Sequence, residues 1–156
     1  IEPLIHGGAS TTVYRSGTPA LSLAVSAEKA LQTALGSFSD RLETVKRLNA
    51  RLRAFLESKP DVRLNSPADA VPHILNLSVN GIKGTVFQRT LSEKGICVSV
   101  KSACSTDGTP SRAVFAVSRD RRNALSSWRI SLSHLTTDAE LDEFEQAYER
   151  CCQELK

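Results

Sequence analysis

The sequence predicts one α/β domain of the two-layer α+β type, in which a short sheet is covered by helices. Two observations carry this prediction: a long stretch of apolar residues spaced three and four apart, and a series of short alternating segments after it. The chain has 156 residues, of which 40% are hydrophobic and 24% are charged. That is enough apolar material for a single core, and the sequence has no run of about 18 apolar residues that would predict a membrane span.

The N-terminal part divides into a loop segment, residues 1–19, and the start of the domain, which we expect to span residues 20–156. Residues 1–19 have no regular period, and their His-Gly-Gly and Arg-Ser-Gly-Thr-Pro runs are typical of loops. From Ala20 onward, one apolar face predicts a long amphipathic helix with a possible break near Gly36 and an end at Pro60. The residues on that face are Leu31, Leu35, Phe38, Leu42, Val45, Leu48, Leu52 and Phe55.

Four short strands and two helices are predicted between this long helix and the C-terminal one. The strands are expected at residues 62–66, 73–79, 96–100 and 128–133, and the helices at 83–94 and 110–117. In the second strand Asn76 and Ser78 alternate with apolar residues, which predicts one polar and one apolar face. Thr137 and Glu140 form a capping box that begins the C-terminal helix. The apolar face of that helix contains Leu141, Phe144, Tyr148, Cys151 and Leu155.

The charge balance is mildly basic, with a net charge of +3 and a pI near 8.8. Only residues 119–122 (Arg-Asp-Arg-Arg) form a tight basic cluster. We interpret this cluster as an exposed basic loop, with a docking point for an acidic protein or RNA as the alternative. Aromatic residues make up only 5% of the chain, which argues against the stacking platform of single-strand nucleic-acid binders. No direct nucleic-acid partner is therefore expected.

The four cysteines predict a reduced, cytoplasmic protein without a metal site. They lack the Cys-x-x-Cys and Cys/His spacings of zinc ligands, so no metal is expected. Cys151 and Cys152 are adjacent in a helical pattern and are poorly placed to form a disulfide with each other. We interpret Cys97 and Cys151 as core residues and Cys152 as an inert helix thiol.

Cys104 differs from the other cysteines because it lies in a small polar segment just after the predicted strand 96–100. A thiol in such a loop can be reached by a reactant, and the nearby Lys101 would favour its reactive thiolate form. A partly exposed thiol without a role is the alternative that these residues leave open.

Arg129 is a second candidate for chemistry, because it lies in an otherwise apolar strand. If Ile130 and Leu132 face the core, Arg129 faces the opposite side of the sheet. An arginine fixed on a strand offers two parallel hydrogen-bond donors to a carboxylate. A solvated arginine on the strand surface is the alternative.

The His-Gly-Gly and Arg-Ser-Gly-Thr segments are a third candidate. Small residues and hydroxyls allow backbone N–H groups to approach an anion closely, as at phosphate sites. Turn geometry explains Gly7, Gly8 and Gly17 equally well.

Four segments, in this order, resemble one known family. They read PLIHGGASTTVYRSGT, ILNLSV, VSVKSACS and SSWRISLSHLTTDAELDEF. Together they are similar to the C-terminal small domain of the pyridoxal-phosphate-dependent cysteine desulfurases, which belong to the class V aminotransferase group of fold type I. The resemblance covers essentially the whole chain, and its strongest parts are the RSGT segment, the Ser-Ala-Cys loop and the Arg-x-Ser-Leu strand.

The resemblance implies a role for three residues. Cys104 would be the nucleophile that attacks the sulfur of the substrate L-cysteine, leaving L-alanine and an enzyme persulfide. Arg129 would bind the substrate carboxylate, and Thr18 would contact the phosphate of pyridoxal 5'-phosphate across a homodimer. The sulfur would then pass to an acceptor protein, as in iron–sulfur cluster assembly or tRNA thiolation.

The resemblance also implies what the chain would lack. The family's cofactor-binding lysine lies in a Ser-His-Lys stretch upstream of His-Gly-Gly, and this chain contains no such stretch. We therefore expect a fragment of a cysteine desulfurase that is inactive alone. The alternatives are a non-catalytic sulfur-carrier or partner-docking domain that docks through residues 112–122, and a selenocysteine lyase, which shares the fold. The chain also departs from the family at Lys101, where a glycine is common.

Overall fold

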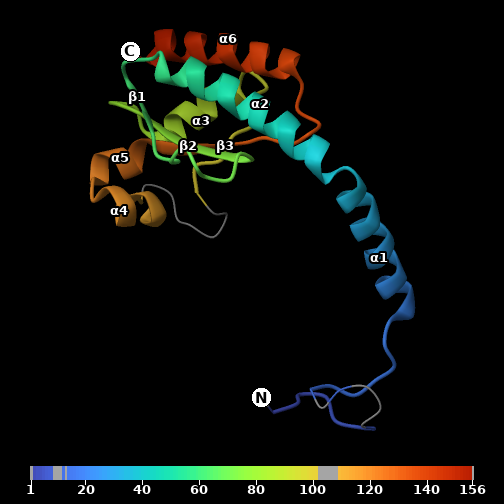
Figure 1. The fold of residues 1–156 in the computed structure, drawn as a ribbon. Helices are drawn as coiled ribbons and strands as arrows, with labels where there is room; N and C mark the ends of the chain where they lie inside the picture. Colours follow the sequence, from blue (N-terminus) through green and yellow to red (C-terminus); the bar gives the residue numbers. More distant parts are fainter. Residues whose placement is uncertain (1, 9–11, 13, 102–108, 156) are drawn as a thin grey trace. The chain divides into compact units, whose positions relative to one another are not determined.

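The computed structural model of the chain describes residues 2–8, 12, 14–101 and 109–155 (Figure 1). The chain falls into two compact units, Ile1–Phe38 and Ser39–Lys156. The division lies later than the boundary between residues 19 and 20 that the sequence leads us to expect, and that boundary stays a prediction.

The described part of the N-terminal unit contains a loop segment and helix α1 (Leu21–Gly36), in which no residue is buried. A single non-helical residue separates α1 from α2 (Phe38–Glu57), which confirms the break predicted near Gly36. The apolar face predicted across both helices is buried only in α2. Leu35 of α1 is 65% exposed, whereas Leu48 of α2 is fully buried.

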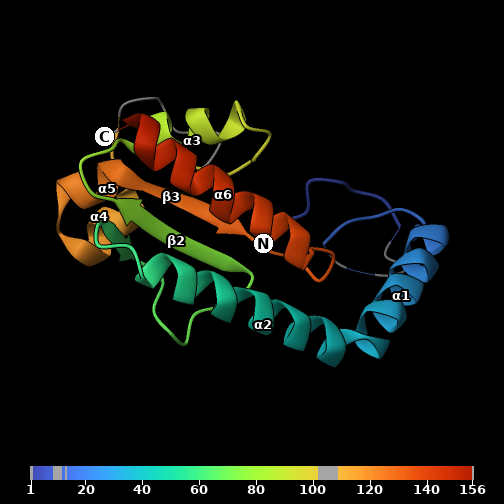
Figure 2. The same ribbon diagram turned by 90° about the horizontal axis from the view of Figure 1, so that it is seen from above.

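The C-terminal unit is built on a three-stranded antiparallel sheet in the order β1-β2-β3. Figure 2 shows β2 and β3 side by side. The strands are β1 (Val62–Leu64), β2 (Ile74–Val79) and β3 (Ser127–Ser131), which confirms three of the predicted strands. The prediction of a strand at 96–100 is wrong. Of these residues only Ser99 pairs with the sheet, through an isolated bridge to Arg129, because the chain crosses the edge of β3 at one point instead of running along it.

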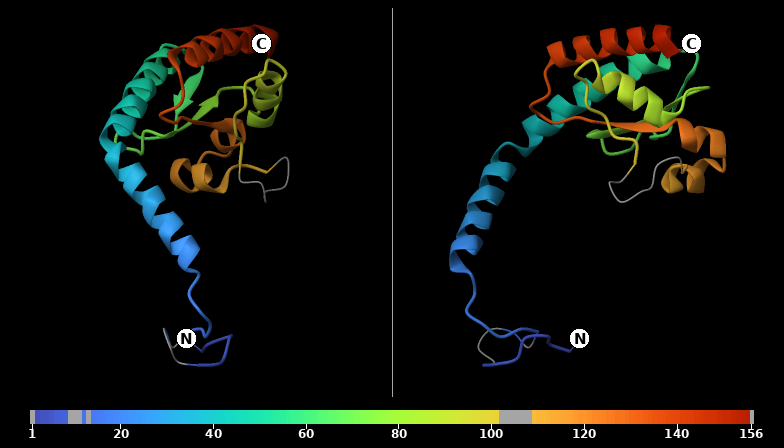
Figure 3. Two further views of the ribbon diagram at one scale, coloured as in Figure 1. Left: turned by 90° about the vertical axis from the view of Figure 1, so that its right-hand side faces the viewer. Right: turned by 180° about the vertical axis from the view of Figure 1, so that it is seen from behind.

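Helices lie on both sides of this sheet (Figure 3). The helices on one side are α2, α3 (Gly84–Ser92) and α6 (Asp138–Leu155), and those on the other are α4 (Arg112–Ser118) and α5 (Arg121–Ser126). The sequence predicted α4 but not α5. Arg119 ends α4 in a left-handed conformation, with φ of 54°. The side chain of Asp120 then caps α5 by accepting from the backbone N–H of Asn123 at 3.1 Å.

The hydrophobic core lies between the sheet and the helices α2, α3 and α6. Leu77 and Trp128 are register partners on β2 and β3, and both are fully buried. The Trp128 ring stacks on Phe87 of α3, with ring centroids 5.1 Å apart. Because side chains alternate along a strand, the next register pair, Asn76 and Arg129, lies on the opposite face of the sheet.

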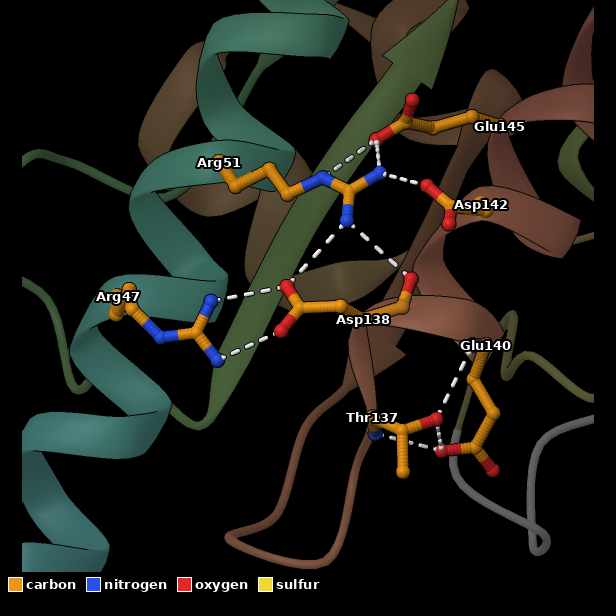
Figure 4. Close-up of polar contacts among 7 residues, drawn as sticks. All are labelled: Arg47, Arg51, Thr137, Asp138, Glu140, Asp142 and Glu145. Carbon is orange, nitrogen blue, oxygen red and sulfur yellow. Dashed lines mark hydrogen bonds and ion pairs between the residues drawn. The ribbon is translucent and has the colours of Figure 1, made fainter.

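Ion pairs join the first turns of α6 to α2 (Figure 4). The guanidinium of Arg47 donates to both carboxylate oxygens of Asp138, at 2.9 and 3.0 Å. Arg51 contacts the same carboxylate as well as those of Asp142 and Glu145. The hydrogen bond from Arg47 lowers the pKa of the Asp138 carboxyl below its ordinary value. These contacts orient α6 against α2 from the solvent side of the core.

The capping box predicted at the start of α6 is confirmed (Figure 4). The Thr137 backbone N–H donates to the Glu140 carboxylate at 2.7 Å, and the Glu140 backbone N–H donates to the Thr137 hydroxyl at 3.2 Å. The hydrogen bond from the Thr137 backbone also lowers the pKa of the Glu140 carboxyl. The N-terminus of α6 is therefore specified by its local sequence.

Candidate functional site

A cleft lies on the polar face of the sheet, bordered by the strands, by α4 and by the segment that ends at Lys101. Its volume is about 1130 Å³. Basic residues line this cleft, and among the described residues no acidic side chain does. The basic residues are Arg63, Lys101, Arg112 and Arg129. This charge distribution favours an anionic ligand.

Arg129 lies in the middle of β3 and lines the cleft. Ile130 and Leu132 are buried in the core, which confirms that Arg129 faces away from it. The Arg129 backbone N–H donates to the Ser99 carbonyl at 2.6 Å, and the Arg129 carbonyl accepts from the Ser99 N–H at 3.0 Å. The side-chain Nε is buried and makes no hydrogen bond to any described residue. Because buried guanidinium donors are normally paired, this side chain suits a carboxylate ligand.

Cys104 lies outside the described residues, as does the rest of the segment 102–108. The residues on either side of this segment, Lys101 and Thr109, both line the cleft. The Lys101 ammonium donates to the Thr109 carbonyl at 3.0 Å and to its hydroxyl at 3.2 Å. The flanks of the segment therefore meet at the cleft that contains Arg129, and the role of Cys104 stays a prediction.

Thr18 lies in the N-terminal unit, just before α1, and is exposed. No described residue forms a hydrogen bond with its hydroxyl. The two loop segments that the sequence singles out lie against each other in this unit, because the Ser16 backbone N–H donates to the Ile5 carbonyl at 3.2 Å. Gly17 has a φ of 117°, a conformation that side-chain-bearing residues rarely adopt.

A set of hydrogen-bonded polar side chains beside the cleft was not predicted from the sequence. Asn65, which follows β1, donates to the Asn76 amide oxygen and to the Ser78 hydroxyl, both at 2.9 Å. Asn123 of α5 donates to the Asn65 amide oxygen, also at 2.9 Å. The alternation in β2 already places Asn76 and Ser78 on one face. The other two members come from distant segments, and no local pattern signals them.

The cysteines among the described residues are all free of disulfides. Cys151 is buried, as predicted, and burial raises the pKa of its thiol. The prediction that Cys97 belongs to the core is wrong, because its side chain is exposed and its segment pairs with the sheet only at Ser99. The described residues include no group of His, Cys, Asp and Glu that could hold a metal ion.

The three arginines of the basic cluster at 119–122 are exposed, as predicted, but the cluster is not a loop, because Arg119 ends α4 and Arg121 begins α5. Its acidic member, Asp120, pairs with Arg63 at 3.7 Å. Within the described ranges, no helix is both long and apolar enough to cross a membrane.

Comparison with known proteins gives one family for most of the chain. The sequence model of the family described as Aminotransferase class-V matches residues 7–144. A protein of Lactobacillus delbrueckii subsp. bulgaricus named NifS/IcsS protein homolog is 30% identical over 156 residues, which cover 98% of this chain and 40% of that protein. A Clostridium botulinum protein named cysteine desulfurase IscS is 31% identical over 147 residues, which cover 91% of this chain and 37% of that protein.

A solved structure supports the same grouping. The structure titled NifS-like protein is 30% identical and superposes with a TM-score of 0.79, over 98% of this chain and 39% of that one. The similarity confirms the predicted fold, a small mixed helix-and-sheet domain. The chain spans about 40% of the length of the relatives it matches.

Proposed function

The chain belongs to the class-V aminotransferase family, and from that premise we propose that the protein carrying it is a cysteine desulfurase. Such an enzyme converts L-cysteine to L-alanine and retains the released sulfur as a persulfide on one of its own cysteines. The names of similar proteins support this reaction. The observation that carries the proposal is the basic cleft, in which a buried Arg129 nitrogen makes no hydrogen bond to any described residue.

We assign the substrate carboxylate to Arg129. The guanidinium is planar and can hold a carboxylate through two parallel hydrogen bonds. The strand that carries it is fixed on one side by β2 and on the other by Ser99, so its backbone position is well defined. No described acidic residue of the cleft competes for it. Binding of the carboxylate at this point would orient the rest of the amino acid for reaction.

We assign the nucleophile to Cys104, on the basis of the sequence motif that contains it. The Cys104 thiolate would attack the sulfur of L-cysteine, so that a sulfur–sulfur bond forms and the bond between that sulfur and the substrate carbon breaks. The electron pair of the broken bond passes to the substrate carbon, which takes up a proton to complete L-alanine. The position of Lys101 and Thr109 at the cleft supports this assignment, because these residues flank the segment that carries Cys104.

Pyridoxal phosphate, when bound, supplies the electron sink that this bond cleavage requires. The chain offers Thr18 to its phosphate, and the exposed threonine fits that role because no described residue uses its hydroxyl. Arg129, one of the basic residues of the cleft, fits the carboxylate of an amino acid held by the cofactor. We further propose that Thr18 serves the partner subunit of a homodimer and that the protein works in the cytoplasm.

Alanine release tests the proposed reaction. The full-length protein, supplied with pyridoxal phosphate, is incubated with L-cysteine and separately with L-selenocysteine. We expect L-alanine from L-cysteine together with an equal amount of sulfide once a reducing thiol is present. Alanine from L-selenocysteine alone would point to a selenocysteine lyase, and the absence of alanine from both would contradict the proposal.

The chain by itself is expected to release no alanine, since its sequence contains no Ser-His-Lys stretch for the cofactor. The same assay on the isolated chain measures this. A labelled persulfide on Cys104 of the isolated chain that passes to an acceptor protein would favour a sulfur-carrier domain instead. Where the sulfur goes next, to iron–sulfur assembly or to tRNA thiolation, depends on that acceptor.

A further inference from the structure

We propose that Asn76 is a second carboxylate-binding residue of this cleft, and that its side-chain amide donates to the same carboxylate as Arg129. The inference rests on the proposed function, because it describes how the cleft holds the carboxylate of an amino acid. It adds a neutral donor beside the cation and thereby fixes the direction of the carboxylate plane.

The first step is the closeness of the two side chains. Asn76 and Arg129 are direct partners on β2 and β3 and share the cleft face. Their backbone groups point away from each other, because Asn76 pairs with Asn65 and Ser66 while Arg129 pairs with Ser99. They therefore form a non-hydrogen-bonded antiparallel pair, the type in which opposite side chains lie closest.

The second step is the orientation of the Asn76 amide. Asn123 donates to the oxygen of Asn65, so the Asn65 nitrogen is directed toward Asn76 and Ser78. That nitrogen donates to the Asn76 oxygen at 2.9 Å. The Ser78 hydroxyl in turn donates to the Asn123 carbonyl at 3.0 Å, which anchors the chain of amides to buried backbone. Each amide thus determines how the next one points.

The third step is what remains available to a ligand. With its oxygen engaged by Asn65, Asn76 has two amide N–H donors that make no hydrogen bond to any described residue. Asn76 is only half-buried, and it lines the cleft together with Arg129. A carboxylate has two oxygens with about four acceptor positions and can receive donors from both residues at once. No described acidic residue lines the cleft to take these donors.

A titration with L-alanine tests the proposal without any catalytic turnover. L-Alanine carries the carboxylate and the amine of the substrate but no thiol. In the isotope-labelled chain, the nuclear magnetic resonance signals of the Arg129 Nε–H and the Asn76 side-chain NH₂ should shift together along one saturation curve. Ethylamine, which lacks the carboxylate, should leave both signals in place.

The Asn76→Asp variant sharpens this test. An aspartate oxygen can still accept from Asn65, but the donors are lost and the new charge pairs with Arg129. We expect L-alanine binding to weaken at least about tenfold. The matched control is Asn80→Asp, the same exchange at an exposed turn residue outside the cleft, which should change binding by less than about twofold.

Three results would overturn the proposal: an Asn76 signal that stays in place while the Arg129 signal moves, no saturable shift of either signal, or wild-type affinity in the Asn76→Asp chain. The first two are read from the wild-type chain and do not depend on how well the variant folds. Joint binding by a protein that releases no alanine from L-cysteine would support the carboxylate site and contradict the desulfurase function, so the two proposals fail separately.

Discussion

We propose that substrate recognition depends on Arg129, because its buried Nε makes no hydrogen bond to any described group and its side chain lines a cleft without described acidic residues. A lysine at this position would keep the charge but lose the planar pair of donors. The two roles of the side chain, attraction and orientation, can therefore be separated by substitution.

We predict that Arg129→Lys raises the KM for L-cysteine in the full-length protein at least about tenfold, because a carboxylate loses its two-point contact. Steady-state alanine release measures this. Arg121→Lys makes the same exchange at an exposed position of α5 outside the cleft and should change KM by less than about twofold. Equal KM values in the two variants would remove Arg129 from substrate binding.

The side of the sheet on which a side chain lies was predictable from the sequence only where the strand itself was predicted correctly. The side on which Arg129 lies followed from the alternation in its strand. The prediction that Cys97 is buried was wrong, because it assumed a strand in a segment that meets the sheet only at Ser99. The contacts among Asn65, Asn76 and Asn123 join segments that are distant in sequence, and they depend on the tertiary fold.

Gly84 shows how one element restricts another. It is the first residue of α3, and a Cβ built there would lie 2.3 Å from the Ser127 carbonyl oxygen of β3. Backbone atoms of a strand that is hydrogen-bonded to its neighbour in the sheet cannot move aside as a flexible side chain can. The helix therefore approaches the strand as closely as it does only because this residue is glycine.

We predict that Gly84→Ala destabilises the C-terminal unit by about 1–3 kcal/mol, since α3 and β3 must separate to accept the added methyl group. Urea unfolding of the chain measures the change. Gly36→Ala is the control, because a Cβ at Gly36 has no described heavy atom within 4 Å and alanine favours helix. A Gly84→Ala chain as stable as the wild type would show that the close approach is not required.

The long helices α2 and α6 were predictable because each has a long apolar period, and α6 also begins at a distinct cap. Helix α5 has only 6 residues, too few for a helical period to be recognised, and its signal is the single capping residue Asp120. The strand at 96–100 was wrongly predicted from its β-branched residues. Such a composition does not distinguish a segment that pairs along the whole edge of a sheet from one that pairs with it at a single residue.

At the scale of the whole molecule, the family was predictable because ordered motifs along the entire chain agree with one another. The family comparison then matched residues 7–144. The chain spans about 40% of the length of its relatives, so its residues supply one part of the proposed active site. We propose that this part contains the cleft that binds the substrate carboxylate, Thr18 for the cofactor phosphate and Cys104 for the sulfur.

The central claim is that Cys104 receives the sulfur. The most direct test is to incubate the full-length protein, with pyridoxal phosphate, with L-cysteine and then measure the masses of its tryptic peptides after alkylation. Trypsin cleaves after Lys101 and so separates Cys97 from Cys104. We predict the mass of one additional sulfur atom on the peptide that contains Cys104 and none on the peptide that contains Cys97. Additional sulfur on the Cys97 peptide instead, or none on the Cys104 peptide, would contradict the claim.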